Sequence, residues 1–148
     1  MLSKKTKYAI KALVALAREN KAMTIQEIAT QERIPKKFLE TILLDLRKQG
    51  ILGSKIGLGG GYHMIKKPKD IPLTQLLRTI DGPIALVSCV SLNFYERCED
   101  CVNEETCGIK SAFTQVRDAT LKILSKTTLE DILKREQALK TLKSKGRK

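Results

Sequence analysis

The chain has 148 residues, of which 42% are hydrophobic and 30% are charged, and its formal net charge is +12. This length and balance fit a soluble globular domain with an extension. No stretch approaches the roughly 18 consecutive apolar residues of a membrane-spanning helix, and the N-terminus lacks the apolar core of a secretory signal. We therefore expect a cytoplasmic protein with no membrane partner.

The positive charge is concentrated in two parts of the chain. Residues 1–82 hold 16 Lys or Arg against seven Asp or Glu, residues 83–133 hold five against eight, and residues 134–148 hold seven against one. A basic first part favours a polyanionic partner such as nucleic acid. A basic surface that only keeps the protein soluble is the alternative.

The first fifty residues contain three helical patterns. Apolar side chains at three- and four-residue steps predict a helix over residues 4–19. Thr24 and Glu27 have the spacing of a capping box, which predicts a short second helix. Pro35 is expected at the first position of a third helix, which ends near Gly50. The predicted buried face of this third helix comprises Phe38, Leu39, Ile42, Leu43 and Leu46.

Residues 51–65 have the pattern of a β-hairpin with a glycine-rich tip, because two short strand-like runs flank GLGGG at residues 57–61. The glycines could belong to a phosphate-binding loop, but the Gly-Lys-Ser/Thr ending and the following helix are absent. A wing explains them better, since glycine permits positive φ and close approach of the backbone to DNA. His63, the only histidine, is interpreted as a surface or packing residue rather than a ligand.

Helix, short helix, tight turn, longer helix and hairpin is the order of a winged helix-turn-helix domain, whose third helix enters the major groove of DNA. Lys36 and Lys37 are expected to contact guanine or phosphate, and Glu40 is expected to accept from cytosine. Lys66 and Lys67 would flank the DNA backbone. The alternative is that these residues are only the solvated face of a core helix. The candidate DNA-binding residues are Thr24, Lys36, Lys37, Glu40, Thr41, Lys55, Gly59, Gly60 and Tyr62.

Two further helical regions follow the hairpin. Leucines predict a helix over residues 73–80, which the sequence DGP at residues 81–83 ends. An apolar stripe predicts a long amphipathic helix over residues 109–125. Thr128 and Asp131 predict a short last helix through Leu133, and the basic residues 134–148 are expected to be disordered. The stripe consists of Ile109, Phe113, Val116, Thr120 and Ile123.

Cys89, Cys98, Cys101 and Cys107 lie within one 19-residue window, and the rest of the chain contains no cysteine. Thiolates are ligands for zinc and for iron–sulfur clusters. Structural zinc sites commonly use two C-x-x-C pairs, but only Cys98 and Cys101 form one here. A disulfide switch needs only two of the four thiols. We therefore favour an iron–sulfur cluster with two or four irons, with zinc or a thiol–disulfide switch as the alternative.

An enzyme is less well supported by the sequence than a regulator. A small iron–sulfur or thiol oxidoreductase would need a general base, a paired nucleophile or a cofactor fingerprint, and the sequence offers none of these. We therefore expect no catalytic residues.

The chain resembles the Rrf-two family of bacterial transcription regulators in three segments: KYAIKAL at residues 7–13, IPKKFLE at residues 34–40 with the leucines after it, and GLGGGY at residues 57–62. That family includes an iron–sulfur cluster regulator, a nitric-oxide-sensing repressor and a cysteine-metabolism repressor. The resemblance covers about residues 1–125 and implies a homodimer joined by the long helix at residues 109–125. Family wings usually carry Arg before the first glycine, where this chain has Ile56, so Lys55 replaces it only in part. The alternative that Ile56 leaves open is a regulator that does not bind DNA and acts only through contacts with other proteins.

The resemblance also implies roles for the cysteines. Cluster-binding members carry three cysteines before the long helix, and Cys89, Cys101 and Cys107 are similar to that trio. Cys98 lies in an insertion and is the candidate fourth ligand. The implied organisation is a winged-helix DNA-binding domain (1–82), a cysteine-bearing sensor loop (83–108), a dimerisation helix with a short terminal helix (109–133) and a basic tail (134–148).

The predicted fold is mainly α with a small β-hairpin wing. The predicted function is a homodimeric transcriptional regulator, an activator or a repressor, that binds a double-stranded DNA operator and responds through its cluster to redox state, nitric oxide or iron.

Overall fold

The computed structural model describes residues 2–145, which form six α-helices, one two-stranded sheet and two short 3-10 helices. The predicted class, mainly helical with one small hairpin, is confirmed. In chain order the elements are α1 (Lys4–Glu19), α2 (Ile25–Glu32), α3 (Lys36–Lys48), β1 (Leu52–Lys55), β2 (Gly61–Met64), η1 (Pro68–Asp70), α4 (Leu73–Ile80), η2 (Ser88–Val90), α5 (Gly108–Lys126) and α6 (Leu129–Lys145).

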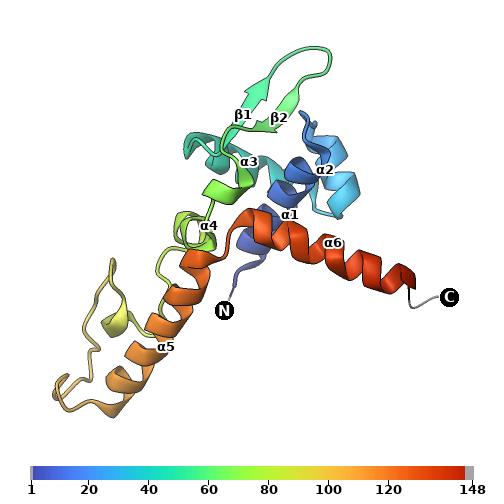
Figure 1. The fold of residues 1–148 in the computed structure, drawn as a ribbon. Helices are drawn as coiled ribbons and strands as arrows, with labels where there is room; N and C mark the ends of the chain where they lie inside the picture. The colour runs from blue at the N-terminus through green and yellow to red at the C-terminus, as the bar shows by residue number, and fades with distance from the viewer. Residues whose placement is uncertain (1, 146–148) are drawn as a thin grey trace.

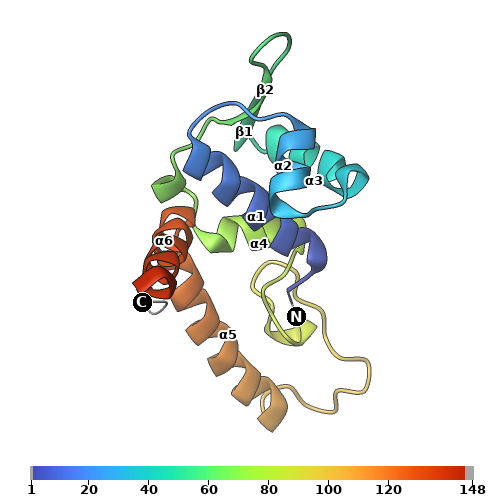
Figure 2. The ribbon, with the colours of Figure 1, turned by 90° about the vertical axis from the view of Figure 1, so that its right-hand side faces the viewer.

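Figures 1 and 2 show a body with projections at two ends. Helices α1 to α4 form the body, and the β1–β2 hairpin projects from one end of it. Helix α5 and the segment before it extend from the other end as an arm. Helix α6 turns away from α5 and contacts α1. The hairpin tip and the far end of the arm are therefore at opposite ends of the molecule.

Local capping explains where the first helices begin and end. Ser3 caps α1 by accepting the Thr6 N–H, and Asn20 ends the helix in the left-handed conformation. The predicted capping box of Thr24 and Glu27 at the start of α2 is confirmed in both directions. Pro35 was predicted at the first position of α3, but it is the N-cap, and the helix begins one residue later at Lys36.

One hydrophobic core lies beneath α1, α2, α3 and α4 and includes the first residue of α6. The prediction for α3 is correct for the four aliphatic residues of its buried face but wrong for Phe38. That ring is 45% exposed and packs edge-to-face against Tyr8 at a centroid distance of 5.7 Å. The largest fully buried side chains are Leu13, Leu16, Ile28, Leu39, Ile42, Leu43, Leu46, Ile51, Leu52, Ile71, Leu76 and Leu129.

The hairpin is attached to the body at its base. Strands β1 and β2 pair antiparallel, with Leu52 opposite Met64 and Lys55 opposite Gly61. The Met23 N–H donates to the Tyr62 carbonyl at 2.9 Å, and the Tyr62 N–H donates to the Met23 carbonyl at 2.8 Å. Gly61 has φ +130°, and a Cβ at this position would overlap the Met23 carbonyl. Glycine therefore lets the wing pack directly against the segment that leads into α2.

The prediction of a short last helix and a disordered tail is wrong for residues 134–145, because α6 continues to Lys145. The helix starts at the predicted capping box, where Asp131 Oδ2 accepts the Thr128 N–H at 2.8 Å. Leu129 is fully buried in the core, which anchors the first turn. Ion pairs four residues apart, Lys134 with Glu130 and Lys140 with Glu136, support the later turns. Residues 146–148 of the predicted tail lie outside the described residues.

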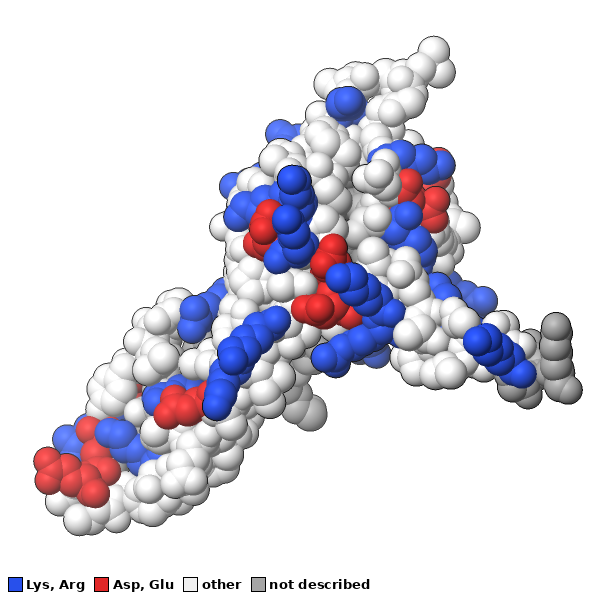
Figure 3. Space-filling model, viewed as in Figure 1, with Lys and Arg blue, Asp and Glu red and all other residues white. Residues whose placement is uncertain are grey.

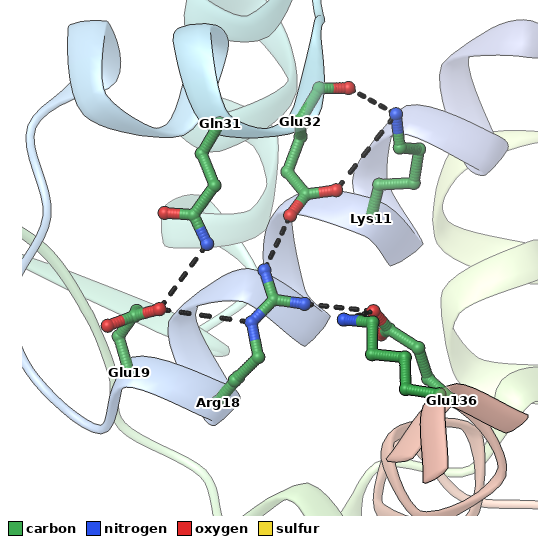
Figure 4. Close-up of polar contacts among 7 residues, drawn as sticks. Lys11, Arg18, Glu19, Gln31, Glu32 and Glu136 are labelled. Carbon is green, nitrogen blue, oxygen red and sulfur yellow. Dashed lines mark hydrogen bonds and ion pairs between the residues drawn. The ribbon is translucent and has the colours of Figure 1, made fainter. Parts of the chain in front are cut away.

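Arg18 of α1 joins two helices of the body to α6 (Figure 4). Its guanidinium lies 2.7 Å from a Glu32 oxygen on α2 and 3.0 Å from a Glu136 oxygen on α6. Lys11 donates to the Glu32 carbonyl and lies 4.0 Å from its carboxylate. Hydrogen bonding to Glu32 and the nearby carboxylates raise the pKa of Arg18 against the opposing effect of partial burial. This network connects the second half of the chain to the helix-turn-helix.

Within residues 2–145, no helix combines the length and the apolar character needed to cross a membrane.

Candidate nucleic-acid interface and cysteine site

The outward face of α3 carries the predicted base-reading side chains. Lys36, Lys37, Glu40 and Thr41 are all exposed in its first two turns. Within residues 2–145, none of the three charged ones takes part in an ion pair. Pro35 contributes no side-chain cap. The first turn of α3 therefore presents exposed cations and its own amides in the direction expected for a recognition helix.

Thr24 lies at the exposed start of α2, but its side chain has a structural role. Its hydroxyl accepts the Glu27 N–H at 3.2 Å and donates to the Glu27 carboxylate at 2.9 Å. These hydrogen bonds to Thr24 lower the pKa of Glu27. Any contact with phosphate at this position would thus come from the helix N-terminus together with the hydroxyl, rather than from a free side chain.

The predicted wing residues fall into two groups. Lys55 and Gly59 are exposed, whereas Gly60 and Tyr62 are half-buried. A Cβ on Gly60 would overlap the Lys55 carbonyl, so this glycine is required by the turn itself. Tyr62 pairs through its backbone with the segment before α2. Gly60 and Tyr62 therefore support the wing, and Lys55 and Gly59 remain available for contact.

Basic and acidic side chains are unevenly distributed over the face shown in Figure 3, although both occur on the body and on the arm. Basic side chains predominate over the body and along α6, and the projecting hairpin tip is uncharged. Ile56 and Leu58 at that tip are completely exposed. Acidic side chains gather at the far end of the arm. The surface around α3 and the hairpin is thus the part suited to a polyanion.

The four cysteines line a single hollow in the arm. Its volume is about 360 Å³, and its walls are the segment at residues 87–107 and the first turn of α5. All four side chains are free thiols. Cys89 is only 7% exposed, because η2 packs against α5, whereas the other three cysteines are half-buried. The structure brings together the four residues that the sequence singled out.

The thiols differ in their local chemistry. A hydrogen bond with Cys89, together with burial and the negative charge of neighbouring thiols and Asp100, raises the pKa of the Cys98 thiol. Cys107 is the N-cap of α5, and its Sγ accepts the Lys110 N–H at 3.4 Å. In the described part of the chain, no three His, Cys, Asp or Glu side chains are arranged to hold one metal ion.

Polar contacts that the sequence analysis missed brace the cysteine segment. Arg117 on α5 donates to the Val90 carbonyl, next to Cys89. The Tyr95 hydroxyl donates to Glu104 at 2.7 Å, and Lys110 lies 3.3 Å from the same carboxylate. The Tyr95 hydroxyl and then Lys110 lower the pKa of Glu104. Each of these contacts has a partner in the irregular segment before α5, so no periodic pattern could have paired them.

The predicted stripe on α5 is only partly covered within the described chain, where Phe113 and Thr120 are half-buried. No residue of α5 is fully buried, although the helix contacts α4 and η2. Ile109, Val116 and Ile123 remain 64%, 44% and 66% exposed. An apolar row of this kind along an arm is typical of an interface with another protein.

Comparison with known proteins gives consistent results. Residues 2–135 match the Rrf2 (Rrf-two) family, described as an iron-dependent transcriptional regulator. The chain is 46% identical over 138 residues to an rrf2-like HTH-type transcriptional regulator of Rhodobacter capsulatus, covering 90% of this chain and 92% of that protein. It is 30% identical over 147 residues to the HTH-type transcriptional regulator NsrR of Bacillus subtilis, covering 97% and 98%. The solved structure of CymR (YrzC), the global cysteine regulator of B. subtilis, matches with a TM-score of 0.75 and 27% identity, covering 91% of this chain and 97% of that one.

Proposed function

Because the chain belongs to the Rrf2 family of transcriptional regulators and not to a family of enzymes, we propose that it is a homodimeric regulator whose operator binding depends on an iron–sulfur cluster. The observation that carries the proposal is the arrangement of four free thiols around one hollow, on an arm attached to the DNA-reading body. The family's description as iron-dependent supports iron as the metal.

DNA binding is assigned to α3 and the wing. The exposed start of α3 would enter the major groove, where Lys37 and Glu40 would read bases. Lys36 and Lys55 would contact phosphates, together with Lys66 and Lys67 after the hairpin. Because several lysines would displace counterions, the affinity should fall steeply with salt concentration.

The cysteine hollow fits a thiolate-bound cluster in its chemistry. A cluster would supply reactivity toward oxidant, nitric oxide or iron scarcity, with Cys89, Cys101 and Cys107 as three ligands and Cys98 as the fourth. Within residues 2–145 the thiols are not arranged around a single ion, so cluster binding would require the cysteine segment to rearrange. Lys110 would help offset the negative charge of the ligands and of Glu104, since its ammonium lies beside that carboxylate.

The dimer is assigned to α5. Its exposed stripe would pair with the same stripe of a second copy, which gives a two-fold symmetric contact. Two recognition helices held by this dimer would bind half-sites about one helical turn of DNA apart, or a multiple of that distance. Ordering of the cysteine segment against α5 would then change the spacing of the two helices, which is how the cluster would control affinity.

A second candidate uses the same fold with a different thiol chemistry. The four free thiols around one hollow could instead bind zinc, or two of them could form a disulfide on oxidation. Metal and sulfide quantification distinguishes the cluster from zinc and from a switch without metal.

Alanine substitutions at two predicted base contacts and at two predicted phosphate contacts test the DNA-binding assignment. We expect Lys37→Ala and Glu40→Ala to relax sequence preference, costing about 1–3 kcal/mol on the selected duplex and little on random DNA. Lys66→Ala and Lys67→Ala should weaken binding to both DNAs equally. The measurement is fluorescence anisotropy with a duplex selected by the protein from a random pool. Equal losses on both DNAs for all four variants would contradict the groove assignment.

A further inference from the structure

Phe38 is an exposed aromatic residue on the helix assigned to the major groove. Its two nearest core neighbours on α3, Leu39 and Ile42, are at most 1% exposed, whereas Phe38 is 45% exposed. It lies in the first turn, next to Lys37. A large apolar side chain in this position loses the hydrophobic stabilisation that burial would provide, so contact with an apolar group of a ligand would be favourable.

The orientation of the Phe38 ring is fixed by the body. Tyr8 of α1 contacts it edge-to-face, with an interplanar angle of 87°. Lys5, one turn earlier on α1, is held by an ion pair with Asp45 at 2.7 Å. The exposed part of the ring is therefore a preorganised surface.

A shallow hollow of about 420 Å³ lies over this ring. Lys5, Lys37, Phe38 and Thr41 line it, so two cations form the rim and an aromatic ring and a threonine form the apolar part. Cations beside an apolar surface suit a nucleic acid. The cations would attract the negative phosphates, and the apolar surface would contact the edge of a base. The cations do not suit a purely apolar protein surface.

Only one base has an apolar group in the major groove. Thymine carries a 5-methyl there, and phenylalanine and the threonine methyl are among the side chains that contact it. From this chemistry we infer that Phe38 and Thr41 form the contact surface for the 5-methyl group of a thymine in the operator. This inference rests on the proposed function and adds a methyl-reading pair to the charged readers Lys37 and Glu40.

Removal of single methyl groups tests the inference. A duplex is first selected by the wild-type dimer from a random pool, and each thymine is then replaced in turn by deoxyuridine, which lacks only the methyl. At one or more thymines the wild type should lose affinity by about fourfold, the effect of exposing one buried methyl group. Phe38→Ala should bind the parent duplex more weakly and should be insensitive to that same replacement.

Further variants separate this role from a structural one. Phe38→Met retains an apolar side chain and should keep the sensitivity, while Thr41→Ser removes only a methyl and should reduce it. Leu139→Ala, which alters an exposed apolar residue on α6, should behave like the wild type. Thermal unfolding of each variant reports whether the helix-turn-helix remains folded, and Phe38→Met and Thr41→Ser decide the matter if Phe38→Ala unfolds.

The outcomes are distinct. If a duplex is selected but no deoxyuridine replacement has an effect that depends on Phe38 or Thr41, the methyl contact is overturned and the proposed DNA binding stands. A change in oligomeric state in Phe38→Ala would show that a second copy of the chain covers the ring. That result would also overturn the methyl contact and leave the proposed DNA binding intact. If no sequence is enriched, the proposed function fails and this inference fails with it.

Discussion

The four thiols have different surroundings, and these differences imply unequal contributions to a cluster. Cys89 is buried in η2, next to the Val90 carbonyl that Arg117 holds, so its position is the most fixed. Cys107 is fixed by the start of α5. Cys98 is half-buried and depends on its contact with Cys89.

Serine substitutions should therefore give graded effects. Cys89→Ser should abolish cluster assembly, because the most rigid ligand is lost. Cys98→Ser should allow assembly of a cluster that is lost faster, because a hydroxyl replaces the thiolate of the least firmly held ligand. The measurement is the decay of visible absorption after anaerobic reconstitution, with Ser88→Ala as the control. A Cys98→Ser cluster as stable as that of the wild type would show that the fourth ligand lies elsewhere.

The grouping of the four cysteines could be predicted from the sequence by residue type and spacing, and the charged residues of α3 remain predicted base contacts. The sequence could not identify Arg117, Tyr95 and Glu104, whose contacts depend on how an irregular segment folds back on α5. Phe38 was misassigned for a related reason. Its position in the apolar pattern predicts burial, but the neighbouring Tyr8 covers only one side of the ring.

At the scale of elements, the wing is held to the helix-turn-helix by a short backbone pairing that requires glycine. Gly61 has a left-handed φ of +130°, and its α-carbon faces the Met23 carbonyl. The pairing of Met23 with Tyr62 therefore depends on the absence of a side chain at residue 61.

Gly61→Ala should separate the wing from the body. The combined strain and overlap should lower the free energy of unfolding by about 1–3 kcal/mol and weaken operator binding. Gly108→Ala is the matched control, because a Cβ there meets no atom within 4 Å and no unusual φ is involved. Chemical denaturation and anisotropy measure the two effects. Unchanged stability in Gly61→Ala would contradict the described attachment of the wing.

Helix α5 is predicted to hold the dimer together through its exposed stripe. Val116→Glu introduces a charge in the middle of that stripe, where burial of an unpaired carboxylate would be strongly unfavourable. We expect the variant to be monomeric in analytical ultracentrifugation and to lose operator affinity. Gln115→Glu, an exposed neighbour off the stripe, should remain dimeric. A dimeric Val116→Glu protein would assign the dimer interface to another surface.

Helices with strong periodicity were predictable from sequence, because local spacing and caps determine them. Helix α6 was predicted too short, since its lysine-rich second half carries little apolar pattern. Its length is instead supported by Leu129 in the core, by ion pairs along the helix and by the Arg18 contact with Glu136. These are tertiary and pairwise effects that a search for periodicity does not detect.

At the scale of the whole molecule, the DNA-reading surface and the cysteine hollow lie at opposite ends, so any control must pass through the body. Two structural links are available. Asp81, just after α4, accepts hydrogen bonds from the N–H and hydroxyl of Ser3 at the start of α1. Arg18 joins α1 to α2 and α6. Movement of the arm relative to α1 would therefore be transmitted to the helix-turn-helix.

The most direct test compares operator affinity with and without the cluster. The protein is reconstituted anaerobically with iron and sulfide, its iron, sulfide and visible absorption are quantified, and binding to the selected duplex is measured before and after removal of the metal. We expect iron and sulfide to co-purify with the dimer and operator affinity to change by about 5- to 150-fold on cluster loss. A protein that takes up no iron or sulfide, or that binds its operator equally well in both states, would contradict the proposal that the four cysteines form an iron–sulfur sensor.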